Sequence, residues 1–321
     1  MKRIHVAVAV ATVFAFSFGA QTVLTQRGQG RGAGGPAQPP AQWWVAKDKP
    51  GQYGNNKPHI KLADLKAKHA GQATWNETVV DDINYHAEYN AAPPGTKVSP
   101  RARAETREFW VVIEGEIHFN LAGQDPIVAT RGSIVQAPRR TLYSFEVAGT
   151  GPALWIDVNQ QHYKTLFPAD GAAPASIPGA TPGSTIMKVG FTLAPAPYTG
   201  NNKPHFNLHE AEKNPQFSGQ NVVQDDHMWA QAIWGYEKNL PPYDPTDKGH
   251  FHMGTAEWWI IMESSIRHNI ETVGDFTSSE GDVAYVPPGT WHATRFSGPG
   301  PSCRLAISGV QFTNMLELKG Q

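Results

Sequence analysis

Short apolar runs of about five residues, each closed by a turn residue, recur along the chain. Two of them, Phe109–Ile113 and Trp258–Met262, are rich in aromatic and β-branched side chains. Two others, Ser133–Ala137 and Asp282–Val286, each end directly before a proline. Runs of this kind, bounded by Gly or Pro, are typical of strands. Many short strands in one chain predict a sandwich or a jelly-roll barrel, so the expected fold class is all-β.

The chain also repeats itself. The segment Tyr53–His59, which contains Asn-Asn-Lys-Pro-His, recurs at Tyr198–His205. The runs Glu108–Glu114 and Gly132–Pro138 both recur 149 residues later. Three matched blocks in the same order indicate a tandem duplication. We therefore expect an N-terminal domain at 50–167, a Gly/Pro-rich linker at 168–184 and a C-terminal domain at 185–321.

Two histidines of the repeated segment, His59 and His205, have no chemical partner by spacing. Their repetition favours a structural role, in an arm that packs on the other repeat. Short helical turns are expected just after each of these arms, at Asp64–His69 and His209–Lys213.

The N-terminal segment is typical of an export signal. Lys2 and Arg3 precede an apolar stretch that ends in small residues at Ala20, and no twin-Arg pair precedes that stretch. This layout predicts a Sec-type signal peptide at 1–20, followed by a flexible Gly/Pro-rich tether at 21–49. The expected location is secreted or periplasmic, with no membrane segment after cleavage. An uncleaved anchor is the alternative.

Composition excludes several classes of protein. The chain has 321 residues, and its 27 Lys and Arg nearly balance 28 Asp and Glu, which argues against nucleic-acid binding. Its 31 Gly and 26 Pro fit many strands joined by turns. A single cysteine, Cys303, excludes a disulfide framework and a thiolate zinc cluster. Any bound metal would have to be held by histidine and carboxylate side chains.

Histidines in the second copy have the spacing of metal ligands. His250 and His252 lie two residues apart, which on a strand puts both imidazoles on one face with Cα atoms about 7 Å apart. Glu257 opens the next strand, and His292 follows a later one. Three neutral imidazoles and one carboxylate suit a first-row divalent metal and leave room for water, substrate or dioxygen. A vestigial site that binds no metal is the alternative.

This pattern resembles the cupin superfamily, and the duplication resembles a bicupin with two tandem jelly-roll barrels. The first family motif is G-x5-H-x-H-x3–4-E-x6-G. Its core matches His250, His252 and Glu257, whereas Asp244 and Ser264 replace its two glycines.

The second family motif is G-x5-P-x-G-x2-H-x3-N. It matches from Gly281 to His292, and Phe296 replaces its final Asn. The departures from both motifs fall at turns and at a position that binds no metal. The resemblance implies one divalent transition metal per chain, with Fe as the default and Mn, Cu, Ni or Zn left open.

The first copy keeps the scaffold of the motif and loses its ligands. Counting back from Glu108, Arg101 and Arg103 occupy the two His positions, and Tyr143 occupies the third. Guanidinium groups stay protonated and only donate hydrogen bonds, so they cannot coordinate a cation. We expect this copy to be free of metal, with Arg101 paired to Glu108. The alternative is an anion pocket built from Arg101, Arg103, Arg139 and Arg140.

Aromatic side chains crowd the second copy. Strand alternation from Glu257 predicts that Trp259 faces the barrel interior and Trp258 faces outward. Trp259 and Tyr285 are the candidate contacts for an aromatic or otherwise apolar small-molecule substrate. The alternative is that these rings only fill the barrels and the interface between them. Arg267 and Arg295 are candidate anchors for a substrate carboxylate.

Together these features favour an exported, metal-dependent oxidoreductase of the dioxygenase type, with Glu257 as the candidate catalytic residue that moves a proton. The alternatives are a decarboxylase, isomerase or lyase of a small acid or sugar, and a protein that binds a metal or small ligand without catalysis. The two barrels are expected to pair within one chain as a pseudo-dimer, and the sequence leaves further assembly open.

Overall fold

The computed structural model describes residues 45–160, 164–168, 177, 180–189, 194–214, 218–309 and 313–316. The expected signal peptide (1–20), most of the tether (21–49) and most of the linker (168–184) lie outside the described residues. Among the helices of the described part, none has the length and apolar character needed to cross a membrane.

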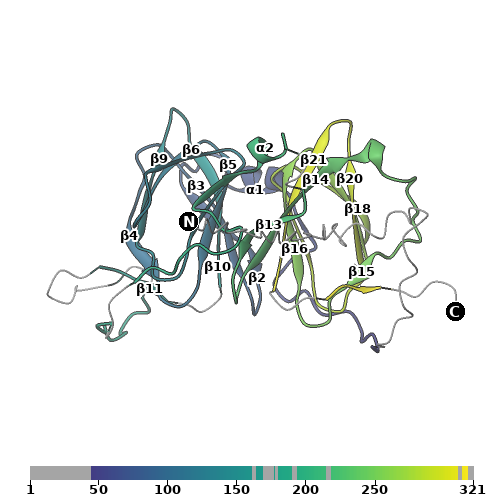
Figure 1. Ribbon diagram of the computed structural model, residues 1–321, viewed down its shortest axis with the longest axis horizontal. Coiled ribbons are helices and arrows are strands. Elements are labelled where there is room, and N and C mark those ends of the chain that lie inside the picture. The colour runs from purple at the N-terminus through teal and green to yellow at the C-terminus, as the bar shows by residue number, and fades with distance from the viewer. Residues whose placement is uncertain are drawn as a thin grey trace, which may run out of the picture.

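Two β-barrels stand side by side, with α1 and α2 close together where they meet (Figure 1). The N-terminal barrel combines a sheet in the order β12-β8-β5-β10-β3-β2 with a sheet in the order β11-β4-β9-β6-β7. The expected all-β jelly-roll fold is confirmed. Its strands are β2 (Trp75–Asp81), β3 (His86–Ala92), β4 (Lys97–Arg103), β5 (Glu108–Glu114), β6 (Glu116–Leu121), β7 (Ile127–Thr130), β8 (Ser133–Ala137), β9 (Tyr143–Ala148), β10 (Ala153–Asn159) and β11 (Thr165–Leu166), joined by β12 (His205–Asn207).

The C-terminal barrel repeats this plan. One sheet has the order β1-β19-β16-β21-β14-β13 and the other β18-β17-β20-β15-β22. Its strands are β13 (Gln220–Gln224), β14 (Trp229–Tyr236), β15 (His250–Phe251), β16 (Glu257–Glu263), β17 (Ser265–Ile270), β18 (Gly274–Ser279), β19 (Val283–Val286), β20 (His292–Ser297), β21 (Pro301–Ser308) and β22 (Met315–Leu316), joined by β1 (His59–Ile60). A 3-10 turn, η3 (Glu237–Asn239), follows β14.

The two repeats exchange their N-terminal arms. Strand β1 of the first repeat pairs with β19 of the second, and His59 Nε2 lies 2.8 Å from Asp282 Oδ2. In return, β12 of the second repeat pairs with β8 of the first, and His205 Nε2 lies 2.9 Å from Ser133 Oγ. The helices α1 (Leu62–Lys68) and α2 (Leu208–Ala211) follow these arms. The expected packing of each arm on the other repeat is confirmed.

Most buried side chains belong to three apolar clusters. The largest lies between the barrels and draws on both repeats, including Tyr89, Ile156, Trp258 and Leu305. The other two fill the interiors of the N-terminal and C-terminal barrels. Because successive side chains of a strand point to opposite faces, each six-stranded sheet contributes one face to a barrel interior and the other to the inter-barrel core. Trp259 belongs to the barrel interior and Trp258 to the inter-barrel core, as alternation predicted.

The two repeats are related by a pseudo-twofold symmetry, and some charged residues at equivalent positions obey it while others do not. Arg131 and Glu280 are 149 residues apart and bind each other through two hydrogen bonds of 2.6 and 2.7 Å. Lys66 forms an ion pair with Glu114 beside α1. At the corresponding place beside α2, Glu212 meets Glu263, so two carboxyl groups replace a cation and an anion. Burial and the Glu263 carboxyl raise the pKa of Glu212 to about 8.

The Glu212–Glu263 contact predicts a loss of stability at alkaline pH. The pKa of Glu212 is raised in the folded protein. Its contribution to folding stability is therefore fully present below pH 4.5, the ordinary pKa of a glutamate, and is lost as the pH rises to about 8. Glu212→Gln keeps a donor for Glu263 without a titrating proton. Solvent screening limits the effect at this partly exposed site. We therefore expect the free energy of unfolding of the variant to exceed that of the wild type by about 1 kcal/mol at pH 9 and to equal it at pH 5.

Urea unfolding of both proteins at the two pH values, with a chelator present, measures this difference. The chelator is included because His209 Nδ1 lies 3.7 Å from Glu263 Oε2, and these two residues with Glu212 come within reach of one cation. Equal changes in unfolding free energy between pH 5 and pH 9 for both proteins would contradict the assignment.

Candidate metal centre

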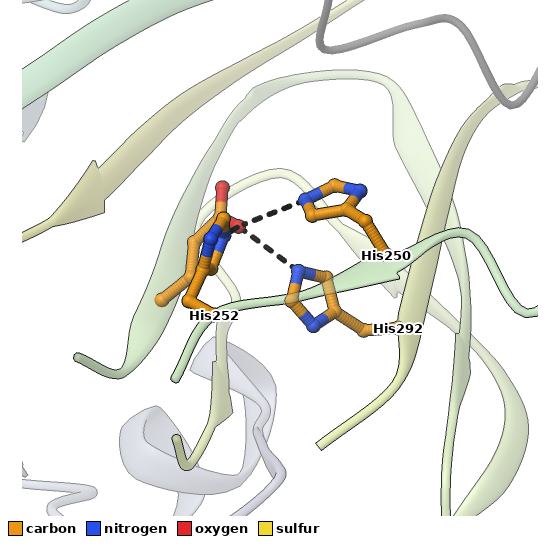
Figure 2. A group of neighbouring side chains, drawn as sticks. His250, His252 and His292 are labelled. Atoms are coloured by element: carbon orange, nitrogen blue, oxygen red, sulfur yellow. Dashed lines mark hydrogen bonds and ion pairs between the residues drawn. The ribbon is translucent and has the colours of Figure 1, made fainter. Parts of the chain in front are cut away.

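The four expected ligands converge at one end of the C-terminal barrel. Their ligand atoms all lie within 4.8 Å of one another. Glu257 Oε2 lies 2.8 Å from His252 Nε2, 3.0 Å from His292 Nε2 and 3.6 Å from His250 Nε2. Figure 2 shows the imidazoles of His250, His252 and His292 converging on one point; the first two come from one segment of the chain and the third from β20. The spacing of the sequence motif therefore corresponds to a single cluster in space.

Backbone geometry brings the ligand strands together. His250 and His292 face each other in the pairing of β15 with β20. Gly249, directly before β15, has φ of +68°, and a Cβ there would lie 2.2 Å from the His292 carbonyl oxygen. Glycine is therefore required for this close approach. Gly289 fixes the loop before His292, because its N–H donates to the His252 carbonyl at 2.6 Å.

Hydrogen bonds outside the cluster set the tautomers of two ligands. His292 Nδ1 lies 2.9 Å from the Thr290 carbonyl oxygen, and His252 Nδ1 lies 3.3 Å from that of Thr313. A carbonyl only accepts, so Nδ1 donates to it, and the other ring nitrogen, Nε2, is the one aimed at Glu257. Three imidazole nitrogens and a carboxylate oxygen thus converge on a common centre. When the rings are neutral, each Nε2 offers a lone pair there, so the donor set fits a divalent metal.

Burial controls the charge states at the site. It lowers the pKa of His292 to about 4, so this imidazole is neutral at physiological pH. Burial alone would raise the pKa of Glu257, but the contacts with His250, His252 and His292 hold it well below its usual range. The site therefore offers an anionic carboxylate beside a neutral imidazole, which is the protonation state that metal binding requires.

The same positions of the N-terminal barrel hold an ion pair. Arg101 faces Tyr143 across β4 and β9, as His250 faces His292 in the other barrel. Arg103 binds Glu108 through two hydrogen bonds of 2.7 and 3.0 Å, and the Tyr143 hydroxyl donates to the same carboxylate. The sequence-based expectation named the wrong arginine: Arg101 instead lies over the Phe167 ring, 5.3 Å from its centroid.

The two candidate substrate contacts, Trp259 and Tyr285, lie in different parts of the structure. Trp259 lies inside the C-terminal barrel, with its ring 5.5 Å from that of His292. Tyr285 lies in the inter-barrel core instead, where its hydroxyl donates to Asp82 Oδ2 at 3.1 Å. It pairs with Trp258 in the sheet and shares the orientation of that residue. Tyr285 therefore faces away from the barrel interior in which the ligands lie.

The two candidate carboxylate anchors point out of the barrel. Arg267 binds Asp275 at 2.9 Å and stacks on the Tyr243 ring. Arg295 donates to the Pro241 carbonyl oxygen. Both line a separate surface pocket of about 220 Å³. Their side chains lie on the outer face of the β17–β20 sheet, so the anchoring role expected from the sequence does not fit their position.

Sequence reasoning missed two buried polar residues inside the C-terminal barrel. Arg304 on β21 is buried, and its Nε and Nη1 have no hydrogen-bond partner among the described residues. Burial lowers its pKa to about 10, and the Glu257 carboxylate acts in the opposite direction. His268 is also buried, with Nε2 2.7 Å from Ser278 Oγ. A charged residue in the apolar run Pro301–Ser308 was the signal for Arg304.

Comparisons with known proteins agree with this architecture. The family model described as "Cupin domain" matches residues 91–159, which form most of the N-terminal barrel. No curated protein sequence matches the chain.

Three solved structures show the range of similarity. A cupin 2 conserved barrel domain protein from Leptotrichia buccalis has a TM-score of 0.50 at 10% identity, over 78% of this chain and 94% of that one. A salicylate 1,2-dioxygenase variant from Pseudoaminobacter salicylatoxidans, in complex with gentisate, has a TM-score of 0.51 at 13% identity, over 78% and 80%. A variant of oxalate decarboxylase from B. subtilis reaches 0.44 at 13% identity, over 84% and 79%. The N-terminal barrel therefore matches the cupin domain family, and the chain as a whole shares the fold of two tandem jelly-roll barrels with these solved structures.

Proposed function

We propose that this bicupin is a metal-dependent oxidoreductase of the dioxygenase type, acting on a small organic acid in its C-terminal barrel. The convergence of His250, His252, Glu257 and His292 within 4.8 Å carries this proposal. Bound at this site, Fe(II) would supply the redox chemistry, and Mn, Cu, Ni or Zn also accept this ligand set.

The chain itself supplies positioning and exclusion of water. The His250 side chain is 15% exposed, whereas those of His252 and His292 are 2% and 1% exposed. A substrate oxygen would therefore approach on the His250 side. Trp259, whose ring lies 5.5 Å from that of His292, and the apolar cluster around it form an apolar wall beside the site. This wall keeps water away from the reacting atoms and suits an aromatic or otherwise apolar substrate.

Arg304 favours an acid over a neutral substrate. Strand β21 places it opposite Ile261, on the face that also carries Glu257 and Trp259. Its two unpartnered donors are buried in the same barrel, and a buried guanidinium is stabilised by an anion that accepts from it. We assign Arg304 the role of holding the substrate carboxylate, in place of Arg267 and Arg295.

Oxygen uptake with metal-reconstituted protein tests the function. Salicylate and gentisate are suitable first probes, because salicylate 1,2-dioxygenase shares the fold. Other hydroxylated aromatic acids and flavonoids extend the panel, with Fe-, Mn- and Cu-loaded protein. We expect uptake with at least one acid and little with the matched phenol that lacks the carboxylate. Arg304→Gln should raise KM for the acid more than it lowers kcat.

The other outcomes of this assay would contradict the proposal. Release of CO2 from oxalate without oxygen uptake would instead indicate a decarboxylase. Bound metal with no turnover of any probe would indicate a binding protein.

Glu257 has a second role in this proposal, as the group that moves a proton during turnover. Glu257→Gln keeps an oxygen ligand and the shape of the side chain but cannot accept a proton. We expect the variant to retain metal, with affinity lowered about 10- to 100-fold, and to lose turnover when saturated with metal. Metal content and steady-state rates separate the two effects. Turnover retained in the metal-saturated variant would remove Glu257 from proton transfer.

We also propose that the chain is exported by a Sec-type signal and functions outside the cytoplasm. Lys2, Arg3 and the apolar stretch up to Ala20 support this proposal. Expression of the full chain in a bacterial host with a periplasm should yield a mature protein that begins at Gln21. Edman sequencing of the periplasmic fraction measures this directly. A chain that keeps Met1 and stays in the cytoplasm would contradict export.

A further inference from the structure

The N-terminal barrel contains an open cavity of about 610 Å³, lined by strands β2, β3, β4, β5, β9 and β10. Cavities that hold small molecules in proteins range from about 300 to 1,000 Å³. We propose that this cavity is a second, metal-free ligand site that takes an uncharged polyhydroxy compound of mono- or disaccharide size. The inference is independent of the function proposed for the C-terminal barrel.

The cavity does not fit a free anion. Arg103 already forms an ion pair with Glu108, and its Nη1 donates to Thr165 Oγ1 at 2.7 Å. The carboxyl groups of Glu88, Glu108 and Asp157 face the same space. Arg139 and Arg140, which the sequence suggested for an anion pocket, are not among its lining residues. Arg101 is the lining guanidinium without a carboxylate partner among the described residues, and an anion beside it would also face Glu88 and Glu108.

A cation fits no better. Arg101 and Arg103 line the cavity, and His86 lies between two carboxylates. His86 Nδ1 is 3.1 Å from Asp81 Oδ1, and Nε2 is 3.1 Å from Glu88 Oε1, which raises the pKa of His86. His86 and Arg103 are therefore already neutralised by carboxylates of the wall, whereas Arg101 lies over the Phe167 ring. A neutral ligand disturbs none of these pairs.

Three polar groups in the cavity wall, on Trp155, Asp157 and Gln160, lack partners among the described residues. Trp155 is 6% exposed, and its Nε1–H, a donor, makes no hydrogen bond. Asp157 Oδ1, an acceptor, is also unpaired. Burial and the nearby Glu108 raise the pKa of Asp157 well above its usual range, which favours the neutral form of this carboxyl. An anion would satisfy only the donor and an ammonium only the acceptor, whereas a hydroxyl group satisfies both.

The rest of the wall fits the apolar faces of a sugar ring. Tyr143, Phe145 and Trp155 line the cavity, and the rings of Phe145 and Trp155 meet edge to face at 5.7 Å. Asn90 adds an amide with both donors and acceptors. In the C-terminal barrel, the residues 149 positions after Trp155 and Asp157 are Arg304 and Ala306. The two barrels have therefore diverged at the very residues that would contact a ligand.

Calorimetric titration of the mature protein tests the site, with glucose, maltose and myo-inositol as neutral probes. Glucuronate and glucosamine serve as the anionic and cationic comparisons. We expect saturable binding of at least one neutral probe, at one site per chain, weaker binding of both charged compounds, and unchanged affinity after chelation of metal.

Trp155→Phe removes only the donor and should weaken the binding at least tenfold. Trp110→Phe is the matched control, because Trp110 Nε1 is buried and unpaired in the same barrel but does not line the cavity. A heteronuclear NMR spectrum of wild-type protein gives a second measurement that needs no variant to fold. There the Trp155 indole N–H signal should shift with the probe.

Three results would overturn the proposal. They are no saturable binding of any neutral probe, tighter binding of glucuronate or glucosamine, and equal loss of affinity in Trp155→Phe and Trp110→Phe.

Discussion

Replacing His292 with alanine will remove both metal and turnover from the C-terminal barrel. Its Nε2 lies 3.0 Å from Glu257 Oε2, and its side chain is almost fully buried. Changes to groups that merely orient a metal ligand cost about 10- to 100-fold in affinity, so loss of a ligand should cost more than about 100-fold. Metal content after dialysis, measured by mass spectrometry, and turnover with added metal report the two losses.

His118→Ala is the matched control for this prediction. His118 is half exposed on the N-terminal barrel and contacts only Glu116 among the interactions described. This variant should keep its metal and its rate. A His292→Ala protein that retains stoichiometric metal after dialysis would show that the ion is held elsewhere.

The second large effect is expected in the N-terminal barrel, where Arg103→Met should cost about 3–5 kcal/mol of unfolding free energy. Glu108 is 1% exposed at its side chain, and Arg103 is its one cationic partner in the structure described here. Breaking a buried pair by removing one member leaves a charge without compensation. The wild-type metal content of the C-terminal barrel should remain.

A double-mutant cycle checks this interpretation. Arg103→Met combined with Glu108→Leu removes both charges, and it should regain most of the lost stability, because a buried pair can often be replaced by apolar residues of similar volume. Urea unfolding of the two single variants and the double variant gives the coupling energy. A cost below 1 kcal/mol for Arg103→Met alone would show that Glu108 is not held as a buried anion.

The ligand set was predictable from sequence for a physical reason. His250, His252 and Glu257 lie within eight residues, so their relation depends on local strand geometry. The constant offset of 149 residues then maps Arg101, Arg103 and Tyr143 onto the metal positions of the other barrel. The pairing of Arg101 opposite Tyr143 and of His250 opposite His292 agrees with that mapping.

The residues that sequence reasoning misplaced depend on long-range register. Tyr285 belongs to β19, whose residues are all buried, so alternation of polar and apolar positions gives no sign of its orientation. The orientation of Tyr285 is instead set by its pairing with Trp258 in the neighbouring strand. Arg304 faces the barrel interior through the pairing of β21 with β16, which shifts register beyond Ile261. Neither pairing is encoded within a short window of sequence.

The choice of Arg103 over Arg101 has a similar origin. Both lie on β4 and have the same face by alternation, so the sequence offers them equally to Glu108. The chain beyond the strand separates them, because Thr165 on β11 receives Arg103 and the Phe167 ring lies against Arg101. The arm exchange, in contrast, was predictable, because a segment repeated in both copies without a chemical pattern indicates a shared structural role.

Anomalous diffraction at the absorption edge of the bound metal, from crystals of the mature protein, tests the central claim most directly. One peak should lie among His250, His252, Glu257 and His292, within about 2.0–2.2 Å of the coordinating nitrogen and oxygen atoms, with none beside Arg103 and Glu108. A peak of equal height in the N-terminal barrel, or no peak among the four C-terminal side chains in metal-loaded crystals, would contradict the account.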